Sequence, residues 1–375
     1  MYNHTKPFFR SAFYSGRGPI IEEETVMKKV SALLLALCLL VALTACGGSS
    51  SAPAATAAPA APAATDVPAA APAEAPADSF GPKDGGTSLT FTTGGPAGTY
   101  YAFGGVIAQK VSEVTSTTVT AITSGGSAAN IDALFMGDAQ LAFAQSDVLS
   151  YAYNGTRSFF DTGAITDFSI VAPLYMEQVQ IVTLNPDIKT VADLGGRSVS
   201  IGAAGSGVYF NAIDILNAYG LTESDIRPTY QSFDESAEAL KDGQIDAAFV
   251  VAGAPTNAVT SLAATNPVYL VSLDEEHISK LMAESPFYAK AVISADVYGT
   301  PEDVTTVAMG AVVIARNDVS DVDVYNFLYG VFENQDSLAH AKASELSLEF
   351  ASSFGGVPYH PGAVAYFADK GISVG

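Results

Sequence analysis

Glycine-rich loops that carry hydroxyl and amide side chains are the segments of this chain best suited to chemistry. The first such loop supplies the candidates Gly94, Gly95, Gly98, Thr99, Tyr100 and Tyr101. Backbone N–H groups at the start of a helix, with no bulky side chains in the way, can donate to an anionic group. The loop is not a Walker loop, since no Gly-Lys-Ser/Thr follows, and its glycine spacing differs from the dinucleotide-binding pattern. Two alternatives stay open, an anion-binding loop and a tight turn.

Three further segments repeat this combination of small and polar residues. They supply the candidates Ser124, Gly125, Gly126, Ser127 and Asn130, then Gln145 and Asp147, and finally Gly205, Ser206 and Gly207. We expect Ser127 to be the N-cap of the helix that follows it, and Asp147 is as well suited to capping as to ligand contact. Two donor-rich helix starts close together favour a binding site over coincidence.

Catalytic machinery is not expected. Both cysteines, Cys38 and Cys46, lie near the N-terminus, and residues 86–375 contain neither Gly-x-Ser-x-Gly nor Ser-x-x-Lys. The three histidines of this part are far apart, and His360 is more typical of a packed or capping residue than of a catalytic one. We therefore expect no enzyme activity, no metal and no cofactor.

The elements that must position these loops follow a repeated order of strand, glycine loop and helix. Strands are predicted at 89–93, 119–122, 141–144 and 199–201, and helices follow the first, second and fourth of them. Residues 133–143 match residues 239–249 at an offset of 106, for example Ala133-Leu134 with Ala239-Leu240 and Gly137 with Gly243. The pattern predicts an α/β protein of two lobes, each a mainly parallel sheet flanked by helices.

Two apolar runs, Ile170–Leu174 and Val307–Ile314, are expected to carry the chain between the lobes. Lobe one is then predicted to comprise residues 87–172 and 308–375, and lobe two residues 173–307. The segment 322–366 is predicted to return to lobe one as helices. Ligands of such sheets bind outside the carboxyl ends of the strands, so the loops should meet at a cleft between the lobes.

The N-terminal region has the form of a secretory signal. Residues 27–45 join Lys28-Lys29 to an apolar run that is too short to span a membrane and ends in Leu43-Thr44-Ala45-Cys46. This ending resembles a lipobox, which implies lipid attachment at Cys46; the alternative is a signal peptide with an incidental cysteine. Residues 1–26 are predicted to be untranslated leader, with Met27 as the start. Residues 46–86, rich in Ala and Pro, are predicted to be an extended tether.

Charge excludes one class of partner. Residues 1–46 carry five Lys or Arg and three Glu, residues 47–85 one Lys and four acids, so residues 86–375 hold −21 of the net charge of −22. Binding to a phosphate backbone requires clustered Lys and Arg. We expect no nucleic-acid partner, and we expect a monomer.

Taken in order, the motifs resemble the TAXI type of substrate-binding proteins of TRAP transporters. The resemblance covers about residues 88–375 and rests on Thr93-Gly94-Gly95…Gly98-x-Tyr100-Tyr101, Ser124-Gly125-Gly126-Ser127-x-x-Asn130, Gly137-x-x-x-Leu141-Ala142-x-x-Gln145-x-Asp147, Leu194-Gly195-Gly196-Arg197-Ser198-Val199-x-x-Gly202, Tyr325 before Phe332-Glu333-Asn334, and His360-Pro361-Gly362-Ala363. It implies a periplasmic-binding-protein fold of the second class. It also implies delivery of an organic anion, often glutamate or a dicarboxylate, to a membrane permease driven by an ion gradient.

The expected function is therefore that of an extracytoplasmic, lipid-anchored solute-binding protein. Its ligand carboxylate should be held by amides and hydroxyls, because none of Arg157, Arg197, Arg227 and Arg316 is placed in the cleft by the sequence. For an amino-acid ligand, Asp147 or Glu177 is the expected partner of the ammonium group, with Glu177 as a solvated surface acid the alternative. An ABC-type receptor of the same fold is the second candidate function, and an anchored hydrolase the third.

Overall fold

The computed structural model describes residues 80–375. The predicted leader, the signal peptide, Cys46 and most of the tether lie outside the described residues. Residues 80–86, which the prediction assigns to the tether, already contact the folded body. The backbone N–H of Lys83 donates to Asn326 Oδ1 at 2.7 Å, and Lys83 Nζ lies 4.7 Å from the centre of the Tyr325 ring.

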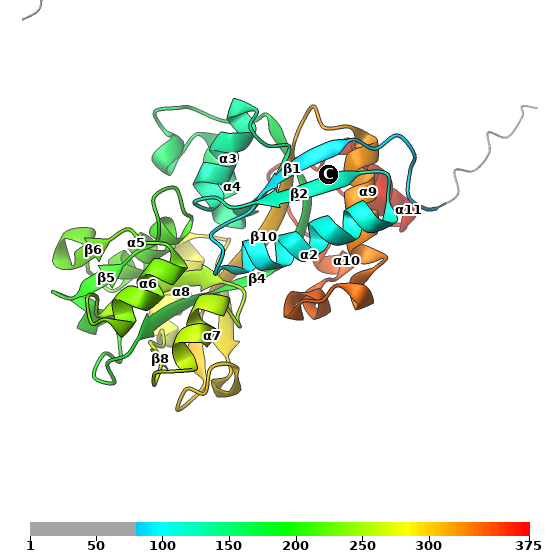
Figure 1. Ribbon diagram of the computed structural model, residues 1–375. Coiled ribbons are helices and arrows are strands. Elements are labelled where there is room, and N and C mark those ends of the chain that lie inside the picture. Colours follow the sequence, from blue (N-terminus) through cyan, green and yellow to red (C-terminus); the bar gives the residue numbers. More distant parts are fainter. Residues whose placement is uncertain (1–79) are drawn as a thin grey trace, which may run out of the picture. The chain divides into compact units, whose positions relative to one another are not determined.

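The fold is α/β and is organised around one ten-stranded sheet (Figure 1). The strand order is β2-β1-β3-β10-β4-β7-β5-β6, with β8 beside β4 and β9 beside β10. The strands are β1 (Ser88–Thr92), β2 (Thr118–Ile122), β3 (Leu141–Gln145), β4 (Phe168–Thr183), β5 (Ser198–Ser200), β6 (Arg227–Thr229), β7 (Ala247–Ala252), β8 (Tyr269–Leu270), β9 (Ala289–Ile293) and β10 (Val304–Arg316). The α-helices are α2 (Thr99–Val114), α3 (Ser127–Met136), α4 (Ser146–Asn154), α5 (Val208–Ala218), α6 (Phe233–Lys241), α7 (Asn257–Ala263), α8 (Glu275–Glu284), α9 (Asp321–Phe332), α10 (Leu348–Ala351) and α11 (Pro361–Asp369). Short 3₁₀ turns include η1 (Arg157–Phe159) and η6 (Ala341–Glu345).

Two long antiparallel strands, β4 and β10, join the two halves of the sheet. At about 3.3 Å per residue the 16 residues of β4 extend roughly 50 Å, enough to run through both halves. The predicted crossover runs lie within these strands, and the predicted lobe boundaries at 172/173 and 307/308 fall inside them as well. On either side lies a parallel trio, β2-β1-β3 in one half and β7-β5-β6 in the other.

The internal repeat appears in the topology as well as in the sequence. In each trio the strand that comes first in the chain lies in the middle, with the second strand outside it and the third beside the long strands. The offset of 106 relates α3 and β3 to α6 and β7. Gly137 is the C-cap of α3, and Gly243 follows the C-cap residue of α6. Their φ values are 84° and 68°, in a backbone region that favours glycine.

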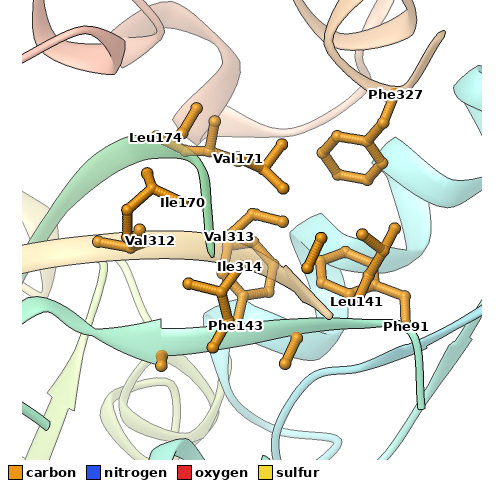
Figure 2. Packing of buried hydrophobic residues seen from close by; sticks show 14 of the residues in the cluster. Phe91, Leu141, Phe143, Ile170, Val171, Leu174, Val312, Val313, Ile314 and Phe327 are labelled. Atoms are coloured by element: carbon orange, nitrogen blue, oxygen red, sulfur yellow. The ribbon is translucent and has the colours of Figure 1, made fainter. Parts of the chain in front are cut away.

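Each half has its own hydrophobic core, and we call the halves lobe one (β1–β3, α2–α4, α9–α11) and lobe two (β5–β7, α5–α8). In lobe one, Phe91 and Phe143 pack with centroids 5.0 Å apart, and Phe327 of α9 covers Phe91 edge-on at 5.7 Å (Figure 2). The predicted return of the C-terminal segment to lobe one agrees with this packing. Lobe two buries one cluster on each face of its sheet, around Phe249 and around Val250.

Candidate ligand-binding site

A cavity lies between the two lobes, where the loops after the parallel strands meet. Its volume is about 70 Å³, room for roughly five to seven water-sized groups. Lobe one and the adjoining β4 line it with Gly94, Gly95, Gly98, Thr99, Tyr100, Ser124, Gly125, Gly126, Ser127, Gln145 and Glu177. Lobe two lines it with Ala203, Ser206, Gly207, Val208, Ser232, Phe233, Val251 and Ala252.

Three helices begin at this cavity without a side-chain cap. The N-cap residues of α2, α3 and α5 are Gly98, Gly126 and Gly207, and no side chain at these positions bonds to the first-turn amides. The expectation that Ser127 is the N-cap was wrong, because Ser127 is the first residue inside α3 and its Oγ instead accepts from the N–H of Gln145 at 3.1 Å. First-turn N–H groups that no side chain caps, together with the helix dipoles, favour a negatively charged group in the cavity. Two of these amides already have backbone partners, since Ala129 N–H donates to the carbonyl of Gly205 and Phe210 N–H to that of Gly207.

Among residues 80–375, Glu177 is the only acidic side chain that lines the cavity. It lies on β4, is 2% exposed, and accepts a hydrogen bond from the hydroxyl of Tyr100 at 3.0 Å. Burial raises the pKa of Glu177 to about 8, while the bond from Tyr100 acts in the opposite direction. Tyr100 is itself fixed by stacking on Phe143, with ring centroids 4.6 Å apart. The alternative that Glu177 is a solvated surface acid is therefore wrong.

No Lys or Arg side chain lines the cavity among residues 80–375. Arg157 pairs with Asp214 at 2.8 Å, Arg197 and Arg227 approach Asp246 at 3.6 and 3.8 Å, and Arg316 pairs with Asp318. Arg316 is the last residue of β10. Lys342 of η6 does not line the cavity either: it is 2% exposed, pairs with Glu345 at 2.5 Å, and its Nζ lies 5.8 Å from the centre of the Tyr175 ring.

Four of the predicted site residues do not line this cavity. Tyr101 is 37% exposed and points away, because successive residues of a helix are turned by about 100°. Asn130 is buried and is used by the scaffold, donating to the carbonyls of Thr93 and Phe143. Asp147 is buried outside the cavity and accepts from Asn211 Nδ2 at 2.9 Å. Gly205 lies at a neighbouring surface cavity.

The remaining predicted residues lie together in the wall. They are Gly94, Gly95, Gly98, Thr99, Tyr100, Ser124, Gly125, Gly126, Ser127, Gln145, Glu177, Ser206 and Gly207. Sequence reasoning missed most of the wall supplied by lobe two, including Phe233. The repeat carries a signal for it, because an offset of 106 from Ser127 leads to Phe233, and each residue is the first of its helix.

His360 has the capping role that was the alternative to catalysis. It is the N-cap of α11, its Nδ1 accepts from the N–H of Gly362 at 3.2 Å, and burial lowers the pKa of its imidazole. Residues 80–375 contain no group of three His, Cys, Asp or Glu side chains arranged to hold a metal ion. No helix in this part of the chain is both long and apolar enough to cross a membrane.

Comparison with known proteins gives one family and several distant structures. A sequence model described as the NMT1-like family matches residues 91–371. Among solved structures, the alkanesulfonate-binding protein SsuA from Xanthomonas axonopodis pv. citri is 16% identical, with 69% of this chain and 80% of that chain covered and a TM-score of 0.41. The aliphatic sulphonate binding protein SsuA from Escherichia coli is also 16% identical, with 76% and 91% covered and a TM-score of 0.40. The ligand-binding component of an ABC-type import system from Staphylococcus aureus is 11% identical, with 76% and 92% covered and a TM-score of 0.44. Likenesses this distant say nothing about the ligand of this chain.

Proposed function

The chain belongs to the NMT1-like family, and on that premise we propose that it is an extracytoplasmic solute-binding protein. It captures a small organic molecule in the cavity between its lobes and delivers it to a membrane permease. The observation that carries the proposal is the cavity itself, lined by the loops of both lobes and by three helix starts without a side-chain cap, several hydroxyls and one buried carboxyl group.

The proposed ligand carries a carboxylate. Because no Lys or Arg among residues 80–375 lines the wall, we assign the attraction to the first-turn amides of α2, α3 and α5 and to hydroxyls such as that of Ser127. A dicarboxylate or a glutamate-like amino acid fits this donor set. If the ligand is an amino acid, its ammonium group faces Glu177, and the buried Gln145 Oε1, which has no hydrogen-bond partner, can accept from it as well.

The membrane side of the proposal comes from the sequence. Acylation at Cys46 would anchor the protein on the outer face of the cytoplasmic membrane, and the part of the predicted tether that precedes Phe80 would let the lobes reach a permease of the TRAP type. Membrane retention and processing of a Cys46→Ala variant test this part. If that variant is processed and retained like the wild type, the anchor is wrong.

A thermal-shift screen of amino acids and dicarboxylates tests the binding function. A true ligand should stabilise the protein by RT ln(1 + [L]/Kd), about 2.7 kcal/mol at one hundred times Kd. No shift with any organic anion or amino acid at millimolar concentration would contradict the proposal. Turnover of esters or peptides by the same protein would favour the anchored hydrolase instead.

The pH dependence of affinity then distinguishes the two ligand classes. A ligand ammonium requires the Glu177 carboxylate, so Kd should fall as the pH rises from 6 towards 8, the pKa to which burial raises Glu177. A second ligand carboxylate facing Glu177 requires the protonated acid, so Kd should rise over the same range. Calorimetric titration at pH 6, 7 and 8 measures which of the two occurs.

A further inference from the structure

A group of buried polar side chains crosses the surface where the lobes meet, next to the cavity. Its centre is Asn211, a fully buried residue of α5 in lobe two. Asn211 Oδ1 accepts from Gln145 Nε2 at 3.0 Å, and its Nδ2 donates to Asp147 Oδ2 at 2.9 Å. Both partners belong to lobe one, so a single side chain of lobe two makes two hydrogen bonds across the interface.

The chain of hydrogen bonds continues from Asn211 to the protein surface and ends at another residue of lobe one. Asn211 Nδ2 also donates to the hydroxyl of Tyr288 at 3.0 Å, and that hydroxyl donates to Asp214 Oδ2 at 3.1 Å. Asp214 Oδ1 accepts from Nη1 of Arg157 at 2.8 Å. Arg157 lies in η1 of lobe one, and its guanidinium is 4.9 Å from the centre of the Tyr151 ring.

We infer that Gln145, Asp147, Arg157, Asn211, Asp214 and Tyr288 form a latch that holds the two lobes closed. The inference rests on the proposed function, since a latch matters only if the lobes open. These residues do not face the ligand directly, except Gln145, whose side chain also lines the cavity. They are positioning residues that set how often the cleft is closed, and through that the affinity for the solute.

Burial explains why these bonds act together. Asp147 is fully buried, and its side chain bonds to that of Asn211 through Oδ2. The other carboxyl oxygen of Asp147, Oδ1, has no hydrogen-bond partner. A buried polar group that loses its partner costs much more than an exposed one, so the closed arrangement is stable only with Asn211 in place. Arg157 and Asp214 are partly exposed, and an ion pair of that kind contributes less.

The latch also changes how an arginine variant must be interpreted. Loss of binding in an Arg157→Ala variant would suggest an arginine clamp on the ligand, yet Arg157 does not line the cavity. Its contact with Asp214 lies across the lobe interface, so its removal weakens binding by favouring the open form.

Hydrogen exchange of two backbone amides reports closure directly. The N–H of Ala129 in lobe one donates to the carbonyl of Gly205 in lobe two at 3.0 Å, and the N–H of Ala258 in lobe two donates to the carbonyl of Ala97 at 3.2 Å. Both bonds break when the lobes separate. Exchange is measured on the full chain without added ligand, with amides of β3 and β7 as internal references for fold stability.

We expect Asn211→Ala to speed exchange at Ala129 and Ala258 by roughly 10-fold or more, and Arg157→Ala by about 2- to 5-fold. Arg157→Lys should recover part of the protection, and Lys110→Ala, which removes the exposed Lys110–Glu113 pair within α2, should change neither amide. The latch is overturned if both alanine variants exchange at wild-type rates at these amides, or if β3 and β7 amides accelerate by the same factor in both. Since no ligand is present, a failed solute screen and a failed latch experiment are distinguishable.

Discussion

The two lobes are built from the same arrangement of strands, yet they present different surfaces to the cavity. Lobe one contributes helix amides, Ser124, Ser127, Tyr100 and Gln145. Lobe two contributes mainly apolar side chains, the hydroxyls of Ser206 and Ser232, and the uncapped start of α5. The difference indicates that lobe one supplies most of the polar contacts to the solute and lobe two most of the apolar cover.

Equivalent helices show how this division arises. Helix α3 follows an N-cap glycine, so its first-turn amides have no side-chain cap. Helix α6, its counterpart in the repeat, begins after Ser232, which forms a capping box with Glu235. Amides already bonded by a capping box are not available to a ligand. The N-cap residue therefore decides whether the first-turn amides of these two helices are available to a ligand.

The largest loss of affinity is expected from a substitution that keeps lobe two from closing over the cavity. A Cβ at position 207 would overlap Gln145 Oε1 of lobe one. The backbone of Gly207 has φ −71° and ψ −22°, which alanine adopts without strain. Gly207→Ala should therefore leave the fold intact and weaken ligand binding more than about 100-fold, roughly the loss of two hydrogen bonds to a charged group, measured by calorimetry.

Gly105→Ala is the matched control for this variant. Position 105 lies in α2, and nothing lies within 4 Å of a Cβ placed there. It should bind like the wild type. Normal binding by Gly207→Ala as well would mean that the cleft does not need to close as tightly as it does here.

Two serines at the starts of equivalent helices compare recognition with covering. Ser127→Ala removes a cavity hydroxyl of lobe one and should weaken binding by roughly 10- to 100-fold; it should also lower the free energy of unfolding by about 1–3 kcal/mol, because the buried N–H of Gln145 loses its acceptor. Ser232→Ala removes the cap of α6 and should lower the free energy of unfolding by about 1 kcal/mol, with affinity changed less than about threefold. Denaturant titration and calorimetry measure both quantities, and equal losses of affinity would contradict the division between the lobes.

The buried acid of the cavity makes stability depend on pH. Burial raises the pKa of Glu177 from 4.5 to about 8, so the folded protein holds a proton that the unfolded chain releases. The contribution of Glu177 to the free energy of unfolding is therefore fully present below pH 4.5, and this contribution is lost as the pH rises through 8. The slope is at most about 1.4 kcal/mol per pH unit.

Glu177→Gln isolates this effect, because an amide of similar shape does not titrate. The free energy of unfolding of this variant should vary less between pH 6 and 8 than that of the wild type. Asp147, whose pKa burial raises to about 6, contributes in the same direction at lower pH and stays in both proteins. If the free energy of unfolding of the wild type varied with pH as little as that of the variant, Glu177 would not be the group responsible.

The smallest effect is expected from the apolar cover. Phe233 begins α6 and lies against the cavity and against Gly98. Phe233→Ala removes apolar contact but no hydrogen-bond donor, so the Kd should rise by only about 3- to 10-fold. A loss as large as that of Ser127→Ala would show that lobe two takes part in recognition as strongly as lobe one.

Sequence periodicity was sufficient for most of the fold. The strands around Phe91, Val119, Phe143 and Val199 end within one residue of where the pattern places them, and helices follow the first, second and fourth as predicted. Helix α4 after the third strand was not predicted. The glycine loops were found because small residues at helix starts have few other uses. The antiparallel pairing of β4 with β10 was not predicted, because an apolar run does not specify the direction of its neighbour.

The sequence predicted the site residues that contribute backbone groups of the glycine loops. It did not predict which neighbouring side chains point into the cavity. Tyr100 and Tyr101 are indistinguishable in sequence, but only Tyr100 faces Glu177. Asn130 and Asp147 have the polarity of ligand contacts, yet the fold uses them for its own hydrogen bonds. Phe233 was missed because an aromatic residue at a helix start is far more often core than site.

The adjacent tyrosines allow the most direct test that the polar wall of lobe one holds the solute. Calorimetry on Tyr100→Phe and Tyr101→Phe, with the solute identified by the thermal-shift screen, compares a cavity hydroxyl with an exposed one on the same helix. We predict that Tyr100→Phe raises Kd by roughly 10- to 100-fold, while Tyr101→Phe leaves it unchanged. Equal affinities for the two variants and the wild type, or a loss confined to Tyr101→Phe, would contradict the site.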